Sequence, residues 1–391
     1  MGRIYLDHHA TTPVDPAVVA AMLPYFTERF GNPSGKSHSF AAEAHQAVEE
    51  ARARVAGLVG ARPDEIVFTS GATEADTLAV RGAVRALAPT GKHVVTSVLE
   101  HAAVLEPCRT LEREGFAVTR VRVGSDGIVD LDDVRRALRP DTVLVSLMAA
   151  NNEIGTLQPV AGVGALCREH GAVFHTDAVQ AVGRMAVSVE DWRVDLMSLS
   201  AHKMYGPKGV GALFVRKGRR PSLRLQPQME GGGQERGLRS GTLNVPGIVG
   251  FGAAARLASE ALAKGEAGRI GSLRDRLLAA LRSSIDGIDV NGRLDARLPG
   301  NLNVSIEGIE AETLLLSLGD VVALSSGAAC SEAGGKGSHV LRALDLDDAR
   351  VYSSIRFGIG RYNIEGEIDE TARLLAHAVA ESRARTASSR A

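Results

Sequence analysis

Short apolar runs alternate with longer amphipathic segments between residues 63 and 215. Runs that are apolar on both faces predict strands at 66–69, 93–97, 117–123, 142–148, 172–175, 195–199 and 211–215. Apolar positions at helical spacing predict helices between them at 74–87, 103–114, 131–138 and 160–170. Buried strands that alternate with helices predict a largely parallel sheet covered on both sides.

The pattern changes after about residue 255, where a long helical segment, 270–285, precedes shorter elements. These elements are predicted at 301–306, 311–318, 338–344, 353–358 and 364–383. We therefore expect two domains, a large one over 15–258 and a smaller α+β one over 259–391, which residues 1–14 join. The polar stretch 381–391 is expected to fray, with docking to a partner as the alternative.

The composition narrows the class of protein. The 391 residues carry a formal net charge of −1, so direct binding to nucleic acid is not expected. Three cysteines, Cys108, Cys167 and Cys330, are too few and odd in number for a disulfide framework, and predict a reducing compartment. Since no basic start precedes an apolar run and no stretch reaches membrane-span length, we expect a cytoplasmic protein without a membrane partner.

Polar side chains cluster where the predicted strands end, which is where open parallel sheets bind ligands. Lys203 follows one buried strand, and a desolvated lysine has a lowered pKa and forms imines readily. Ser200 and His202 beside it could donate hydrogen bonds to a phosphate. Asp177 ends another strand with Gln180 close behind, and a carboxylate in this position suits a protonated pyridine nitrogen.

Three more strand ends carry candidate groups. Ala72 and Thr73 open a helix after a small-residue turn, which suits an anion. His101 could stack on a flat ring and move protons, and Asn152 could touch a ring oxygen or a carboxylate. The Gly-rich segment 231–245 has the composition of a functional loop, and neither stretch has the spacing of a nucleotide-binding motif.

Cys330 lies in a Gly-rich segment without apolar periodicity, which favours an accessible nucleophile. Cys108 and Cys167 lie within apolar helical patterns typical of buried structural thiols. Arg356, in a short strand, suits bidentate capture of a carboxylate. Each motif alone also fits a structural role, such as a solvated turn lysine, a helix-capping aspartate, a structural histidine or a surface ion pair.

Several stretches together resemble one family. They include YLDHHATTPVDP, GNPSGKSH, FTSGATEAD, NNEIG, FHTDAVQAVG, SLSAHKMYGPKGVGAL, GGGQERGLRSGTLNV, SSGAAC and SHVLRAL. The chain resembles, nearly end to end, the NifS/IscS-type cysteine desulfurases, which are class V aminotransferases of the pyridoxal-phosphate-dependent fold type I. The resemblance implies a large domain with a mainly parallel seven-stranded sheet and a smaller α+β C-terminal domain that carries a cysteine loop at about 325–338.

The resemblance also implies a role for each cofactor-binding residue. Lys203 would hold pyridoxal 5'-phosphate as a Schiff base, while Asp177 and Gln180 would contact the ring nitrogen and the ring hydroxyl. The phosphate would be bound by Ala72, Thr73, Ser200 and His202. Thr242 would reach the cofactor phosphate of the partner subunit in a homodimer, and His101 would stack on the ring.

The implied substrate is L-cysteine, with its carboxylate bound by Asn152 and Arg356 and its thiol exchanging protons with His101. Cys330 would take the sulfur as a persulfide, release L-alanine and pass the sulfur to acceptors such as an iron–sulfur scaffold, and could transiently ligate a cluster. The family often has SSGSACT where this chain has SSGAACS, followed here by a Gly-rich AGGKG that favours a flexible loop.

Other readings are open. Selenocysteine lyases and other class V aminotransferases share the lysine and the aspartate but need no mobile cysteine. A non-enzymatic sulfur-relay scaffold would keep the fold without the chemistry. The destination of the sulfur, whether iron–sulfur assembly, tRNA thiolation or DNA phosphorothioation, is also open.

Overall fold

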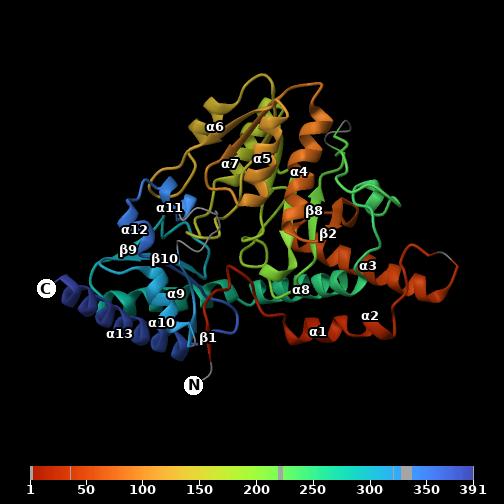
Figure 1. Ribbon diagram of the computed structural model, residues 1–391. Helices are drawn as coiled ribbons and strands as arrows, with labels where there is room; N and C mark the ends of the chain where they lie inside the picture. The colour runs from red at the N-terminus through yellow and green to blue at the C-terminus, as the bar shows by residue number, and fades with distance from the viewer. Residues whose placement is uncertain (1–2, 36, 219–222, 320, 327–336, 391) are drawn as a thin grey trace.

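A seven-stranded sheet forms the centre of the larger part of the molecule. The computed structural model describes residues 3–35, 37–218, 223–319, 321–326 and 337–390 (Figure 1). The strand order is β2-β8-β7-β6-β5-β3-β4, with bounds β2 Ile66–Thr69, β3 His93–Ser97, β4 Ala117–Val121, β5 Thr142–Ser146, β6 Val173–Asp177, β7 Leu196–Ser200 and β8 Gly211–Val215. Strands β3 to β7 pair in parallel and only β8 is antiparallel to its neighbours, which confirms the predicted mainly parallel sheet.

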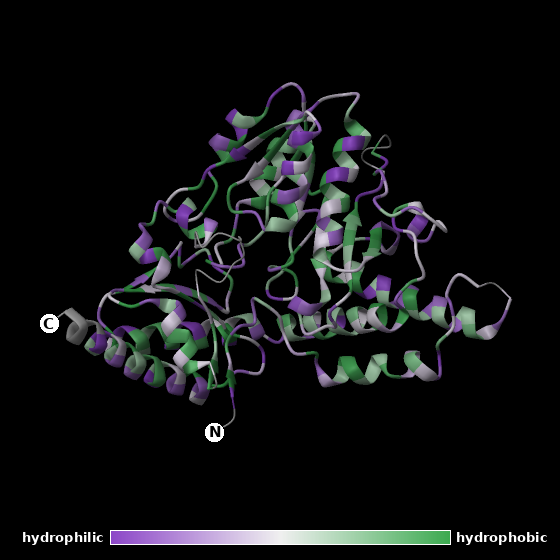
Figure 2. Ribbon diagram, viewed as in Figure 1, coloured by the Kyte–Doolittle hydropathy of each residue, from purple (hydrophilic) through white to green (hydrophobic). Residues whose placement is uncertain are grey.

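Both faces of this sheet are apolar because successive strand residues point to opposite sides. In β3, Val94 packs with helices α4 (Ala72–Leu87) and α5 (Ala102–Arg113), while Val95 joins the cluster of the opposite face. That face is covered by α1 (Pro16–Met22), α3 (Ser39–Val59), α6 (Leu131–Ala137), α7 (Val160–His170) and α8 (Val245–Ala263). Figure 2 shows hydrophobic strands enclosed by helices of mixed polarity.

A separate hydrophobic cluster lies in the smaller part. It is built on the antiparallel sheet β12-β13-β10-β9 and the helices α9 (Glu266–Ser284), α10 (Ala311–Leu318) and α13 (Glu365–Arg390). The strand bounds are β9 Ile288–Val290, β10 Asn301–Ile306, β12 Ser325–Ser326 and β13 Ser354–Gly358. Strand β1 (Ile4–Tyr5) pairs with β11 (Val322–Ala323), and Ile4 and Leu6 belong to this cluster. We therefore propose the domain boundaries expected from the sequence.

The structure also differs from the sequence predictions. The pattern failed to predict α1, α3 and α8, as well as the short helices α2 (Pro24–Thr27) and α12 (Asp348–Tyr352), while helix α11 (His339–Ala343) lies within the element predicted at 338–344. Strands β6 and β7 extend to Asp177 and Ser200, and α13 continues to Arg390 instead of fraying from residue 381. None of the helices among the described residues is long and apolar enough to span a membrane. Cys330 lies outside the described residues.

Candidate active site

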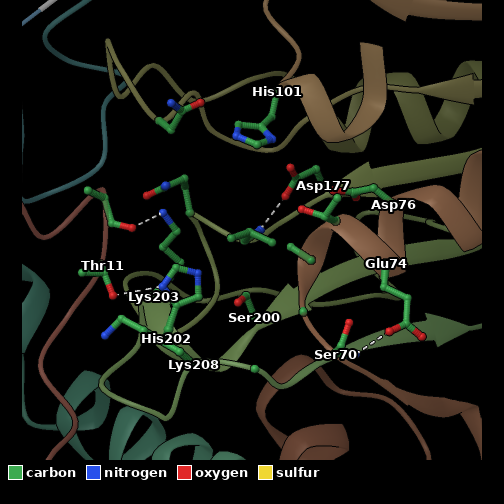
Figure 3. Close-up of a pocket in the computed structure, with 18 of the residues that line it drawn as sticks. Thr11, Ser70, Glu74, Asp76, His101, Asp177, Ser200, His202, Lys203 and Lys208 are labelled. Atoms are coloured by element: carbon green, nitrogen blue, oxygen red, sulfur yellow. Dashed lines mark hydrogen bonds between the residues drawn. The ribbon is translucent and has the colours of Figure 1, made fainter. Parts of the chain in front are cut away.

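A cavity of about 590 Å³ opens at the carboxyl ends of the parallel strands (Figure 3). Nine of the residues singled out from the sequence line it: Ala72, Thr73, His101, Asn152, Asp177, Gln180, Ser200, His202 and Lys203. They come from the ends of β2, β3, β5, β6 and β7, or from the segments that follow these strands. The expected convergence of polar groups at one edge of the sheet is therefore observed.

Lys203 lies in the short 3-10 turn η2 (Ala201–Lys203), directly after β7. Its Nζ donates hydrogen bonds to the backbone carbonyls of His9 at 2.6 Å and Ala10 at 2.7 Å, so the N-terminal segment forms one wall of the site. Burial, together with the nearby guanidinium of Arg184, lowers the pKa of Lys203 to about 8. The amine is thus prepared to act as a nucleophile near neutral pH.

The pH dependence of cofactor uptake should report this lowered pKa. With a pKa of about 8, about a tenth of the Lys203 amine is neutral at pH 7, against roughly 0.03% for an ordinary lysine. We expect the rate of covalent pyridoxal phosphate uptake by the apoprotein to rise about fivefold from pH 7 to pH 8 and to level off above about pH 9. Absorbance of the lysine-bound cofactor measures the rate, with a lysine peptide as the reference. A tenfold rise per pH unit up to pH 10 would contradict the prediction.

Asp177 lies across the cavity from Lys203, at the end of β6 (Figure 3). Its Oδ1 accepts a hydrogen bond from the Val179 N–H at 2.9 Å. Burial raises the pKa of Asp177, while that hydrogen bond and the neighbouring His101 and Lys203 act in the opposite direction. The carboxylate is therefore placed to hold a cationic ring nitrogen in a dry environment.

The opposite end of the cavity suits an anion. Helix α4 begins here, and no described side chain caps its first turn, so the backbone N–H groups around Ala72 and Thr73 are available. The hydroxyl of Ser200 is buried without a hydrogen-bond partner among the described residues. His202, whose Nδ1 lies 3.1 Å from the Thr11 hydroxyl, completes this end. A phosphate here and a pyridine nitrogen at Asp177 fit the two ends of pyridoxal phosphate.

His101 is held by the start of helix α5. Its Nδ1 accepts a hydrogen bond from the Ala103 N–H at 3.1 Å, so the proton of the neutral imidazole resides on Nε2. Burial lowers the pKa of His101, against the opposing effect of the Asp177 charge and with a contribution from the positive charge of Lys203. The ring is therefore neutral at pH 7, with Nε2 left for the cavity.

Arg356 and Thr242 are not among the residues that line this cavity. The Arg356 guanidinium lies beside it, donating to the Asn152 carbonyl at 3.1 Å and to Asp7 at 2.8 Å. A substrate carboxylate at Arg356 would therefore share this guanidinium with Asp7. Thr242 is exposed to solvent and does not line the cavity of its own chain.

Two groups of the site, Asp76 and Arg184, were not predicted. Asp76 follows Thr73 by one helical turn and lies beside Asp177, and this helical spacing from the anion-binding turn could have identified it. The Arg184 guanidinium donates to the carbonyls of Lys203 and His8 and to the Gln180 side chain, at 3.2, 2.6 and 2.9 Å. No sequence pattern indicates that Arg184 joins these three segments.

The fold and the two-ended cavity define a pyridoxal-phosphate-dependent enzyme of fold type I. The aminotransferase class-V family matches residues 4–371. The cysteine desulfurase IscS of Anaeromyxobacter dehalogenans is 54% identical over 376 residues, which is 96% of this chain and 92% of that protein. The chain belongs to the aminotransferase class-V family and, within it, to the cysteine desulfurases.

Solved structures agree with this assignment. A NifS-like protein superposes with a TM-score of 0.89 at 38% identity, covering 97% of this chain and all of that one. SspA in complex with cysteine gives a TM-score of 0.79 at 36% identity, covering 92% of this chain and 100% of that one. Both resemblances run through the two parts of the molecule, so the cavity and its surroundings are included.

Proposed function

We propose that this protein removes sulfur from L-cysteine with pyridoxal phosphate, releasing L-alanine and leaving a persulfide on Cys330. The observation that carries the proposal is the shared cavity of Lys203 and Asp177, closed at its other end by an uncapped helix start. The cysteine complex of the SspA structure supports the choice of substrate.

The residues of the cavity would hold the cofactor at both ends. Lys203 would bind its aldehyde carbon, Asp177 its ring nitrogen and Gln180 its ring hydroxyl. Ser200 and His202, together with the N–H groups at the start of α4, would bind its phosphate. When bound, pyridoxal phosphate supplies an electron-accepting pyridinium that stabilises negative charge on the α-carbon of the amino acid.

The protein groups then move protons and sulfur. Lys203, with a pKa of about 8, is suited to take the α-proton of cysteine once its amine is released. His101 exchanges a proton with the substrate thiol, while Asn152 and Arg356 hold the substrate carboxylate. The Cys330 thiolate attacks the substrate sulfur and a sulfur–sulfur bond forms. The electron pair of the Cβ–sulfur bond stays with the carbon, which is protonated to give L-alanine.

Replacing Cys330 with alanine tests this proposal. We expect the Cys330→Ala protein to bind the cofactor like the wild type and to lose persulfide formation completely, because the other two cysteines of the chain, Cys108 and Cys167, are buried. Mass spectrometry for the persulfide and absorbance of the bound cofactor measure the two properties.

Cys108→Ala is the control, because burial raises the pKa of the Cys108 thiol to about 12 and keeps it un-ionised. That variant should keep full persulfide formation. Sulfide release from cysteine at the wild-type rate by Cys330→Ala, without a persulfide, would assign the chain instead to a lyase or aminotransferase that needs no acceptor thiol.

We further propose a homodimer in which Thr242 reaches the cofactor phosphate of the partner. Thr242 is exposed, and exposed apolar side chains gather between α1 and the start of α3, namely Val19, Leu23, Phe26, Phe30 and Phe40. Phe26 and Phe30 are 60% and 64% exposed, which is unusual for a surface that stays in water. These helices and the green segment before α8 lie on the same side of Figure 1, which favours a second copy of this chain as the occupant.

The persulfide sulfur on Cys330 would pass to an acceptor protein such as an iron–sulfur scaffold, and Cys330 could ligate a cluster during this transfer. No group of three His, Cys, Asp or Glu side chains in the described part of the chain is arranged to hold a metal ion. A cytoplasmic location accords with the need for a reduced Cys330 thiol.

A further inference from the structure

The Gly-rich segment 231–242 is fastened to the large domain by a buried ion pair. Glu235 binds the guanidinium of Arg52, from helix α3, through two hydrogen bonds of 2.7 Å each. The two side chains are only 1% and 4% exposed. A bidentate pair of this kind fixes the orientation of both partners as well as their distance.

The same two side chains also hold the edge of the central sheet. Strand β2 is the edge strand, and its Phe68 N–H donates to the Glu235 carboxylate at 2.7 Å. The Ile66 carbonyl accepts from Arg52 at 2.9 Å and from Arg236 at 2.6 Å. Side chains of the segment and of α3 thus occupy the hydrogen-bonding positions that a further strand would use.

The backbone of the segment is strained at this point. Glu235 and Arg236 have φ angles of +46° and +58°, so two successive non-glycine residues adopt the left-handed region. Such conformations persist where the surroundings over-determine them, and they are concentrated at functional sites. The contacts of Glu235 with Arg52 and β2 are those surroundings.

A second ion pair fastens the segment shortly before Thr242. Arg239 lies 3.0 Å from Glu74, which also accepts the Ser70 N–H at 2.7 Å and lines the cavity. The side chain of Gln234 accepts the Gly241 N–H at 2.8 Å. The segment is therefore held by Glu235 near its start, by Arg239 near its end, and by the hydrogen bond between Gln234 and Gly241 within it. Thr242 itself stays exposed.

We propose that Arg52 and Glu235 are positioning residues that act in trans: they hold segment 231–242 of one subunit so that Thr242 completes the cofactor site of the other. This inference rests on the proposed homodimeric desulfurase. If the pair served stability alone, an apolar pair could replace it, because burying two charges offers little net gain. The Arg52–Glu235 pair is rigid and holds the strained backbone at Glu235 and Arg236. The need to place Thr242 at the end of the segment explains both features.

Mixed dimers with differently tagged subunits test the direction of this effect. In the first dimer, one subunit carries Glu235→Gln and the other Lys203→Ala. The only site able to bind the cofactor covalently then receives a native segment from its partner. We expect this dimer to retain about one cofactor and about half of the wild-type activity per dimer.

In the second dimer, one subunit carries both substitutions and the other is wild type. The only competent site now receives the altered segment, so we expect roughly a hundredfold less activity than in the first dimer, since small misplacements of binding groups have effects of this size. Bound cofactor, measured by absorbance after dilution, should be lost faster from the second dimer. Glu260→Gln, which breaks the exposed Arg256–Glu260 pair of α8, is the matched control and should leave the two dimers equal.

Equal behaviour of the two Glu235→Gln dimers would overturn the proposal, because the pair would then act within its own subunit or through folding. Should Glu235→Gln not fold, Arg239→Gln repeats the test at the partly exposed second ion pair. A chain that is monomeric in solution would also overturn it. Desulfurase activity of the unmixed wild-type protein is measured separately, so failure of the positioning role and failure of the proposed chemistry give different results.

Discussion

Replacing Lys203 with alanine is expected to reduce desulfurase activity by roughly a thousandfold or more and to leave the protein unable to hold pyridoxal phosphate covalently. Lys203 directly follows β7, and burial lowers the pKa of its amine to about 8 in the same cavity that holds Asp177. Borohydride reduction followed by mass spectrometry measures the covalent attachment, and alanine production from cysteine measures activity.

Lys208 provides the matched control. It also lines the cavity, but its side chain is exposed to solvent. Lys208→Ala should retain covalent attachment, with its effect confined to weaker phosphate binding. Cofactor found reduced onto Lys208 in the Lys203→Ala protein would show that the amine at 203 is not required for attachment and would remove the basis of the proposed mechanism.

The central sheet could be predicted because its strands are buried on both faces, which leaves an unmixed apolar signal in the sequence. Polar groups at strand ends misled the prediction of boundaries. Strand β6 was expected to end at His175, yet it continues to Asp177 because buried polar side chains satisfy one another there. His175 lies 2.8 Å from the Ser146 hydroxyl and 3.0 Å from that of Ser198.

The site could be predicted for the polar residues that directly follow a strand, because parallel strands bring their carboxyl ends to one edge of the sheet. Contacts between distant segments could not be predicted in this way. The carbonyls of His9 and Ala10 bind Lys203 only because the N-terminal segment crosses from β1 to the large domain. The alanine-rich sequence of α3 differs little in hydrophobicity between the two faces of the helix. The sequence pattern therefore also failed to predict this helix, which carries Arg52.

Asp177→Asn is expected to lower desulfurase turnover by about 10²–10³-fold while the protein remains coloured by bound cofactor. The amide can still accept the Val179 N–H, so the local backbone should be preserved. It carries no negative charge, however, and therefore cannot keep the ring nitrogen of the cofactor protonated. Alanine formation measures turnover, and absorbance of the lysine-bound cofactor shows that attachment is intact.

Asp76→Asn is the control that shows whether the loss of activity is specific to Asp177 or follows from removing any carboxyl group of the cavity. Burial raises the pKa of Asp76 well above its usual value, with the Asp177 charge contributing, which favours the neutral carboxyl, and an amide of nearly the same shape replaces that form closely. Activity of Asp76→Asn should stay within about threefold of wild type, in contrast to Asp177→Asn. If the two variants lost activity equally, Asp76 would have to be ionised, and the negative charge that stabilises the pyridinium would belong to the pair of carboxylates rather than to Asp177.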